Sequence, residues 1–262
     1  MLSVMSFNIR GPFDKDSEAW EARIINLVPL VRNANPDLIG TQEVHHRQYL
    51  DLTESLPEYG SVGVGRGDGI NADERAAIFY KKDRFTLLET GDFWLSETPD
   101  KPSFGWDAAC IRICTYARLL DNKTQREFAH YNTHLDHVGQ TAMLEGAKMI
   151  REVMLKSDAP AFVTGDFNID EKSAPYEVMT HSGLSDAKYA AKTSMSYGTF
   201  HGYKPGEDIS VKSPIDYLFF IDGKFDIESY EVMVNGGDGC YTSDHYPVLV
   251  KMTQPIKNKE IL

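Results

Sequence analysis

The chain has 262 residues, 42% of them hydrophobic and 25% charged, and 39 acidic against 27 basic residues give a net charge of −12. This composition is typical of a globular protein and excludes a disordered or collagen-like chain. No stretch approaches the roughly 20 apolar residues of a membrane span, and the first ten residues do not resemble a signal peptide. We therefore expect one domain, residues 1–262, in a monomeric, cytoplasmic protein without a membrane partner.

Strand and helix patterns alternate along the chain, which predicts a mixed α/β domain with helices covering sheets. Apolar residues at helical spacing predict helices at 20–31, 45–56 and 140–156. Apolar runs bounded by turn residues predict strands at 2–8, 37–41, 76–80, 85–88, 111–120, 127–133, 161–164, 217–221, 226–234 and 247–251.

Several local features refine this prediction. Pro29 indicates a kink or an early end of the first helix, and Gly165 indicates the end of a strand. The turn KKDR predicts that strands 76–80 and 85–88 pair, and DNKTQ predicts a hairpin between 111–120 and 127–133. Residues 92–109 and 183–213 have weak periodicity and are expected to form irregular, functional loops.

Polar residues able to bind metal or transfer protons stand at the ends of six predicted strands. A strand end is a rigid position from which a side chain can point into a cleft. These residues are Asn8, Glu43, His134, Asp136, Asp166, Asn168, Asp216, Asp244 and His245.

The residue types in this set favour one kind of chemistry. Carboxylate and amide oxygens suit Mg²⁺, or Mn²⁺, whereas the chain has no Cys/His cluster for structural zinc. Histidines beside carboxylates suit proton transfer near neutral pH. A divalent cation, an oriented water and a histidine together favour hydrolysis of a phosphate ester. The three cysteines, Cys110, Cys114 and Cys240, are expected to be buried thiols.

Each of these residues alone has a simpler interpretation as a turn or cap residue, so only the set is informative. Other polar residues favour structural roles from the start. Asn132 is expected to be a hydrogen-bonding partner in the fold, His130 a packed strand residue and His181 a helix C-terminal residue. His45 and His46 open a predicted helix and are expected to be solvated.

Taken in order, the motifs SFNIR, QEV, NTHLDH, GDFN, IDY and SDHYPV resemble the metal-dependent endonuclease/exonuclease/phosphatase superfamily, which is DNase I-like. The resemblance runs from Asn8 to His245 and is nearest to bacterial members close to the deadenylase-like branch. It implies an α/β (α+β) four-layer αββα sandwich of two packed mixed β-sheets flanked by helices. The active site would lie at one edge of the sandwich.

The resemblance also implies roles for individual residues. Glu43 would be the principal metal ligand, Asn8 a ligand or an orienter of that ligand, and Asp244 a residue near the metal. Asp166 would position or deprotonate the attacking water. The remaining catalytic residues would contact the phosphate or orient those that do, and they are Asn168, Asp216, His245 and His134.

The substrate is expected to be selected by the loops. Trp106, together with Phe93, Trp94 and Phe104, either stacks on a substrate ring or anchors its loop. Arg112 either binds a substrate phosphate or is an ordinary strand-surface charge.

His201 and Tyr203 either line the pocket or belong to a glycine-rich turn, and Arg66 is a weak candidate. The absence of a basic run favours a small or nucleotide-like phosphorylated substrate. A DNA or RNA nuclease, deadenylase-like in kind, is the alternative, and a non-catalytic metal-binding interaction module is a third hypothesis.

Overall fold

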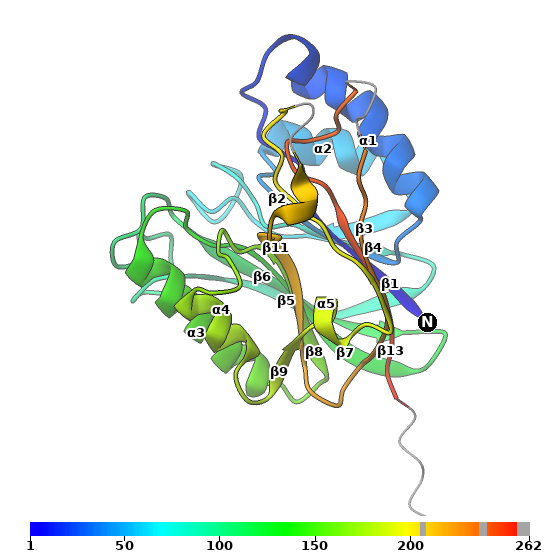
Figure 1. The fold of residues 1–262 in the computed structure, drawn as a ribbon, viewed down its shortest axis with the longest axis vertical. Coiled ribbons are helices and arrows are strands. Elements are labelled where there is room, and N and C mark those ends of the chain that lie inside the picture. The colour runs from blue at the N-terminus through cyan, green and yellow to red at the C-terminus, as the bar shows by residue number, and fades with distance from the viewer. Residues whose placement is uncertain (205–207, 236–239, 256–262) are drawn as a thin grey trace, which may run out of the picture.

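Two mixed β-sheets lie face to face in the computed structural model, which describes residues 1–204, 208–235 and 240–255 (Figure 1). The seven-stranded sheet has the order β10-β12-β13-β1-β2-β4-β3, and the six-stranded sheet has the order β5-β6-β7-β8-β11-β9. The strands of the first sheet are β1 (Leu2–Asn8), β2 (Leu38–Gln42), β3 (Tyr59–Val62), β4 (Ile78–Lys81), β10 (Thr193–Met195), β12 (Asp226–Val232) and β13 (Val248–Thr253). Those of the second are β5 (Phe85–Trp94), β6 (Ile113–Asp121), β7 (Arg126–His134), β8 (Ala161–Asp166), β9 (Leu184–Asp186) and β11 (Asp216–Ile221).

Helices cover the outer face of each sheet, which completes the expected four layers. Figure 1 shows α1 and α2 on one side of the sheets and α3 and α4 on the other. The helices are α1 (Trp20–Ala34), α2 (His46–Ser55), α3 (Gln140–Leu155), α4 (Ala174–Thr180) and α5 (Ala187–Ala190), with short 3₁₀ turns at Asp16–Glu18 and Ile209–Val211. No helix among the described residues is long and apolar enough to cross a membrane.

The core is divided into three main apolar layers because central strands are buried on both faces. In β1, Val4 faces the other sheet, whereas Met5 packs under α1 and α2. In β8, Phe162 faces the other sheet, whereas Val163 packs under α3 and α4. Successive strand residues point to opposite faces, so near-continuous apolar runs in the sequence supply both layers.

The strand register brings polar strand ends together. In the six-stranded sheet, Asp166 at the end of β8 pairs with His134 at the end of β7 and with Asp216 at the start of β11. In the other sheet, Asn8 at the end of β1 pairs with Gln42 at the end of β2, one residue before Glu43. The residues predicted to act together therefore converge at one edge of the sandwich.

The predicted pairing of strands 76–80 and 85–88 is wrong. Strand β4 pairs with β2 and β3 in the seven-stranded sheet, whereas β5 pairs with β6 in the other sheet. The intervening turn therefore carries the chain from one sheet to the other. The predicted hairpin of β6 and β7 is confirmed.

Two predicted ends also differ from the structure. Helix α1 continues through Pro29 to Ala34, and β8 continues through Gly165 to Asp166. A Cβ on Gly165 would lie 2.6 Å from the carbonyl oxygen of Thr133, so this glycine permits close approach of β7 rather than ending the strand.

The two regions expected to be irregular contain more structure than predicted. Residues 92–94 belong to β5, and the described part of 183–213 contains β9, α5, β10 and a 3₁₀ turn; residues 205–207 lie outside the described part of the chain. These elements have three or four residues each, too few for a periodic pattern to be visible. Of the cysteines, only Cys114 is buried; Cys240 is exposed, contrary to expectation.

Candidate active site

A cavity of about 720 Å³ opens where the polar ends of the two sheets meet. Its volume is in the range of small-molecule sites in proteins. The residues that line it are Arg10, Asp14, Glu18, Glu43, Arg66, Glu74, Cys110, Arg112, His134, His137, Asp166, Asn168, Phe200, Gly202, Tyr203, Ile215, Asp244 and His245. Six carboxylates and three arginines are among them, so acidic side chains outnumber basic ones in the wall.

Glu43 lies directly after β2, and its carboxylate is held by Asn8 at the end of β1 and by Gly11 in the loop after β1. Its Oε2 accepts the N–H of Gly11 at 2.9 Å, and its Oε1 accepts Nδ2 of Asn8 at 3.0 Å. The same Nδ2 donates to Oδ2 of Asp166 at 2.9 Å, and Oδ1 of Asn8 accepts the N–H of Arg10 at 3.0 Å. Asn8 thus presents its nitrogen to both carboxylates, and this arrangement orients Glu43 and Asp166 relative to each other.

The environment of Glu43 keeps it ionised. Burial raises its pKa, but nearby His134 and the hydrogen bond from Asn8 outweigh burial and leave the pKa below its usual range. Glu43 also has a left-handed backbone, with φ of 60°. Such a conformation costs about 1–3 kcal/mol in a non-glycine residue and is found often at functional sites.

His245 and Asp216 form a buried pair that reaches across the two sheets. Nδ1 of His245 lies 2.9 Å from Oδ2 of Asp216, and Nε2 of His245 lies 3.7 Å from Oδ2 of Asp166. Burial lowers the pKa of His245, but Asp216 and Asp166 raise it to about 10. His245 is therefore an imidazolium at neutral pH, with its Nε2–H available at the cavity wall.

Asp166 is a buried carboxylate surrounded by polar side chains. Burial and the charge of Asp216 raise its pKa, so it binds a proton more readily than an exposed aspartate does. Its Oδ1 accepts the N–H of Asn168 at 3.0 Å. Asn168 has φ of 52° and donates Nδ2 to the carbonyl of Leu135 at 3.1 Å, which fixes its side chain at the cavity.

His134 has its own carboxylate partner, Glu74. Nδ1 of His134 lies 3.1 Å from Oε1 of Glu74, while Nε2 lies 3.6 Å from Oδ2 of Asp166. Glu74 also pairs with Arg66 and, at 3.1 Å, with Nη1 of Arg112. Burial opposes ionisation of Glu74, but His134 and the two arginines lower its pKa well below the usual range.

The donor set agrees with a hard divalent cation. Glu43 and Asp244 both line the cavity, and burial together with the charge of Glu43 raises the pKa of Asp244. Nη1 of Arg10 lies 3.6 Å from Oδ2 of Asp244. Carboxylate oxygens that repel each other in a cavity are the ligands that Mg²⁺ and Mn²⁺ prefer. The ligand atoms of Asp166, Asp216 and His245 also lie within 4.8 Å of one another.

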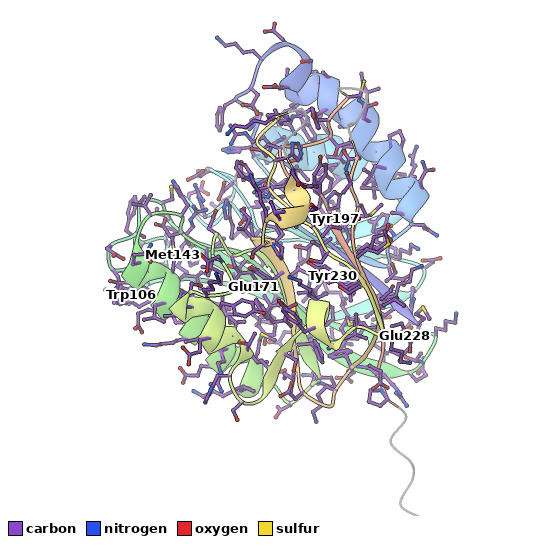
Figure 2. The ribbon with its side chains drawn as sticks, viewed as in Figure 1. Trp106, Met143, Glu171, Tyr197, Glu228 and Tyr230 are labelled. Atoms are coloured by element: carbon purple, nitrogen blue, oxygen red, sulfur yellow. The ribbon has the colours of Figure 1, made fainter. Side chains whose placement is uncertain are left out.

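Of the three residues predicted to bind substrate, only one lines the cavity. Arg112 lines the cavity, where it pairs with Glu74 and with Asp136 at 3.5 Å. Trp106 does not line the cavity, and Figure 2 shows it at the periphery beside the start of α3. His201 is buried behind the cavity wall. Its ring centroid lies 4.7 Å from that of Tyr241, on which it stacks, and 4.3 Å from that of Tyr246.

Several cavity residues were absent from the sequence prediction, and Glu74 and Phe200 are the two that bear most on the chemistry. Glu74 follows a glycine-rich loop without periodicity, and only its acidic side chain before an apolar strand could have indicated it. Phe200 is next to the predicted His201 and is 43% exposed, with its ring centroid 5.0 Å from that of His245. The alternation of side chains in an extended segment could have indicated that neighbours of a buried His201 face the cavity.

The residues given structural interpretations lie outside the cavity. Asn132 is buried between the sheets and donates to the carbonyls of Thr41 and Ala77. His130 is buried beside Thr164, with 2.8 Å between Nε2 and Oγ1. His181 is the C-cap of α4. At the start of α2, His46 is exposed but His45 is half-buried in a capping box.

Comparison with known proteins gives a consistent result. The model of the Endonuclease/Exonuclease/phosphatase family matches residues 5–245. The structure of a protein of that family from Bacteroides thetaiotaomicron is 36% identical, with a TM-score of 0.92 over 97% of this chain and 98% of the other. A mannosyl-6-phosphatase from Bacteroides thetaiotaomicron VPI-5482 is 35% identical, with a TM-score of 0.89 over 97% of this chain and 100% of the other.

A more distant relative is nocturnin from Drosophila melanogaster. It is 24% identical over 250 residues, which cover 82% of this chain but 38% of nocturnin. The likeness therefore concerns only a part of that longer protein.

Proposed function

We propose that this chain, which belongs to the endonuclease/exonuclease/phosphatase family and is a phosphoester hydrolase, acts as a Mg²⁺-dependent phosphomonoesterase on a small phosphorylated ring compound such as a sugar phosphate. The carrying observation is a single cavity of about 720 Å³ that joins Asp166, His134 and His245 to the exposed ring of Phe200. A related mannosyl-6-phosphatase, 35% identical over nearly the whole chain, supports a sugar phosphate as the substrate.

The reacting phosphate would lie between Asn168, His134 and His245. In this position the Nε2–H of His245 donates to a phosphate oxygen, because Asp216 holds Nδ1 and keeps the ring protonated. Asp166 takes a proton from the attacking water, since its pKa is raised and it faces the same space. His134, oriented by Glu74, donates a proton to the leaving oxygen from the opposite wall.

Glu43 and Asp244 would hold Mg²⁺, with Asn8 fixing the direction of Glu43. A cation held there would supply positive charge to offset that of the phosphoryl group. This charge compensation is needed because six carboxylates line a cavity that must admit an anion.

The cavity favours a small ester over a nucleic acid. Each arginine in its wall is already paired with a carboxylate: Arg10 with Asp14, Arg66 with Glu74, and Arg112 with Glu74. A nucleic-acid groove instead offers a run of cations to successive phosphates. The aromatic and apolar wall residues, Phe200, Tyr203 and Ile215, suit one ring.

The test is hydrolysis by purified protein with Mg²⁺, Mn²⁺ or EDTA. The substrates are an aryl phosphate, hexose 6-phosphates, a bis-aryl phosphate, single-stranded DNA and polyadenylate. We expect Mg²⁺-dependent release of phosphate from the monoesters, reduced at least about 100-fold by Asp166→Ala because the general base is lost. Asp158→Ala, at an exposed aspartate, is the matched control and should keep wild-type activity. Faster cleavage of DNA or polyadenylate than of the monoesters would instead support a nuclease.

A further inference from the structure

Arg23 of α1 is fully buried, and all of its N–H donors bind main-chain carbonyls. Its exposed fraction is 0%. The guanidinium has five N–H groups, and the five carbonyls that accept them belong to Ile9, Arg10, Gly11, Glu18 and Thr242. The distance is 2.7 Å to Glu18, 3.0 Å to Arg10, 2.9 Å to Gly11 and 3.2 Å to Thr242.

These carbonyls belong to segments that carry opposite parts of the active site. The loop after β1 provides Gly11, whose N–H binds the carboxylate of Glu43. Thr242 lies two residues before Asp244 and three before His245, far from the first loop in sequence. One side chain therefore connects the segment that holds Glu43 to the segment that carries Asp244 and His245.

Packing alone does not explain an arginine at this position. A buried charge is unfavourable unless it is fully hydrogen-bonded, and an apolar residue in α1 would fill the space without that cost. Only a planar guanidinium can satisfy five carbonyls at once, since a lysine has three donors on one atom. The side chain also lies over Trp20, with Cζ 5.5 Å from the ring centroid.

We propose that Arg23 is a positioning residue that fixes the separation between Glu43 and the Asp244–His245 segment. The effect on turnover rests on the proposed function, whereas the effect on the two segments does not. Arg23 acts through the main chain and contacts no reacting atom. Loss of the connection would leave both segments folded but free to shift relative to each other.

The first measurement is amide hydrogen exchange in Arg23→Lys, which keeps the charge and aliphatic stem. We expect exchange at Ile9–Gly11 and at Thr242–His245 to become at least about tenfold faster, with helix α3 unchanged. Arg126→Lys is the matched control, because Arg126 also binds two main-chain carbonyls, those of Gln254 and Pro255, at the opposite end of β7. Arg126→Lys should leave the exchange rates of both segments unchanged.

The second measurement is turnover of an aryl phosphate by Arg23→Ala with and without guanidinium ion. We expect kcat to fall at least about 30-fold because misplaced groups react slowly, while KM stays within about threefold. Millimolar guanidinium should restore part of kcat, which a loss of folded protein would not allow. If Arg23→Ala does not fold, the same kinetic split is measured in Arg23→Lys.

The outcomes separate this inference from the proposed function. Unchanged exchange in both segments, or equal acceleration throughout the protein, overturns the positioning role. Faster exchange in both segments with wild-type kcat also overturns it. If wild-type protein hydrolyses no substrate, the proposed function fails, and exchange alone decides whether Arg23 holds the two segments together.

Discussion

The two loops that border the cavity are held by different kinds of contact. The loop before β6 is held by carboxylates. Asp136 accepts the N–H groups of Ala109 at 3.1 Å and Cys110 at 3.2 Å, and Asp107 of the loop accepts those of Thr141 and Ala142 in α3. The carboxylate of Asp136 also accepts from Val138 and Gly139 at the start of α3. This polar attachment brings Arg112 to the cavity wall.

The loop that contains His201 is held by stacked rings and by main-chain hydrogen bonds, in which the N–H groups of His201 and Gly202 donate to the carbonyl of Asp244. His201 packs against Tyr241 and Tyr246, and Nδ1 of His201 accepts the N–H of Tyr203 at 3.2 Å. Gly202 and Tyr203 both have positive φ, 57° and 56°, so the chain turns back sharply here. The buried ring fixes this turn, and Phe200 is left exposed at the cavity.

The two loops share one feature although their attachments differ. In each case a polar side chain with apparent ligand-binding chemistry holds the main chain, and a different residue, Arg112 or Phe200, lines the cavity. The two attachments should also respond differently to perturbation. A carboxylate that binds N–H groups depends on its charge and hence on pH, whereas stacked rings depend on shape and buried area.

The largest effect should come from Asp136→Asn. An amide in this position directs an NH₂ group at backbone donors, and we expect the free energy of unfolding to fall by about 3 kcal/mol at pH 7. Activity should fall as well, because Arg112 loses one of its two carboxylate partners. Chemical denaturation and kcat/KM on an aryl phosphate measure the two effects.

The pH dependence of the stability of this variant tests how much the charge of Asp136 contributes. Burial alone would raise the pKa of Asp136, but backbone N–H groups and Arg112 lower it to about 2. In the unfolded chain the pKa is about 3.9, so the stabilisation is complete above that pH and is lost as pH falls toward 2. The stability difference from wild type should therefore shrink between pH 5 and pH 3.

The control for Asp136→Asn is Asp68→Asn. Asp68 accepts N–H groups from Ile70, Asn71 and Ala72, but it is exposed to solvent. The control should change stability and activity little. A difference that stays constant from pH 5 to pH 3 would contradict the role of the Asp136 charge.

A smaller effect is expected from His201→Ala, which removes the centre of the ring stack. We expect a loss of about 2–3 kcal/mol in the free energy of unfolding, less than for a buried Phe or Trp replaced by alanine because an imidazole is smaller. His201→Phe should retain most of the stability because it keeps the stack. If His201→Ala loses activity while His201→Phe keeps wild-type kcat and KM, the ring acts on the loop. A raised KM in His201→Phe would instead indicate direct contact with substrate.

Local patterns in the sequence predict most of the strands and mark several residues of the candidate site, whereas the two packed sheets were implied by the resemblance to the family. Apolar runs such as that of β8 define the strands, and a polar residue such as Asp166 directly after the run marks the cavity edge. The motif order then identifies the remaining members of the set. Register completes the site, since pairing β7 with β8 necessarily places His134 beside Asp166.

Contacts between distant segments were not predictable in this way. The pairing of β4 and β5 with different sheets depends on which apolar face each strand buries, and a short turn between them is compatible with either result. Glu74 stands in a loop without periodicity and acquires its role only by meeting His134, 60 residues later. From the sequence alone, Arg23 is indistinguishable from an exposed arginine on a helix, and only the structure shows its five carbonyl partners.

The smallest effects distinguish the aromatic residues of the two loops. Phe200→Ala should raise KM for a sugar phosphate about tenfold, the value of one lost ring contact, with kcat nearly unchanged. Stability should change little, because the ring is 43% exposed. Trp106→Ala, in the other loop, should leave KM within about twofold of wild type because Trp106 does not line the cavity. A raised KM in Trp106→Ala with a normal KM in Phe200→Ala would reverse the assignment and place the substrate ring against the loop before β6.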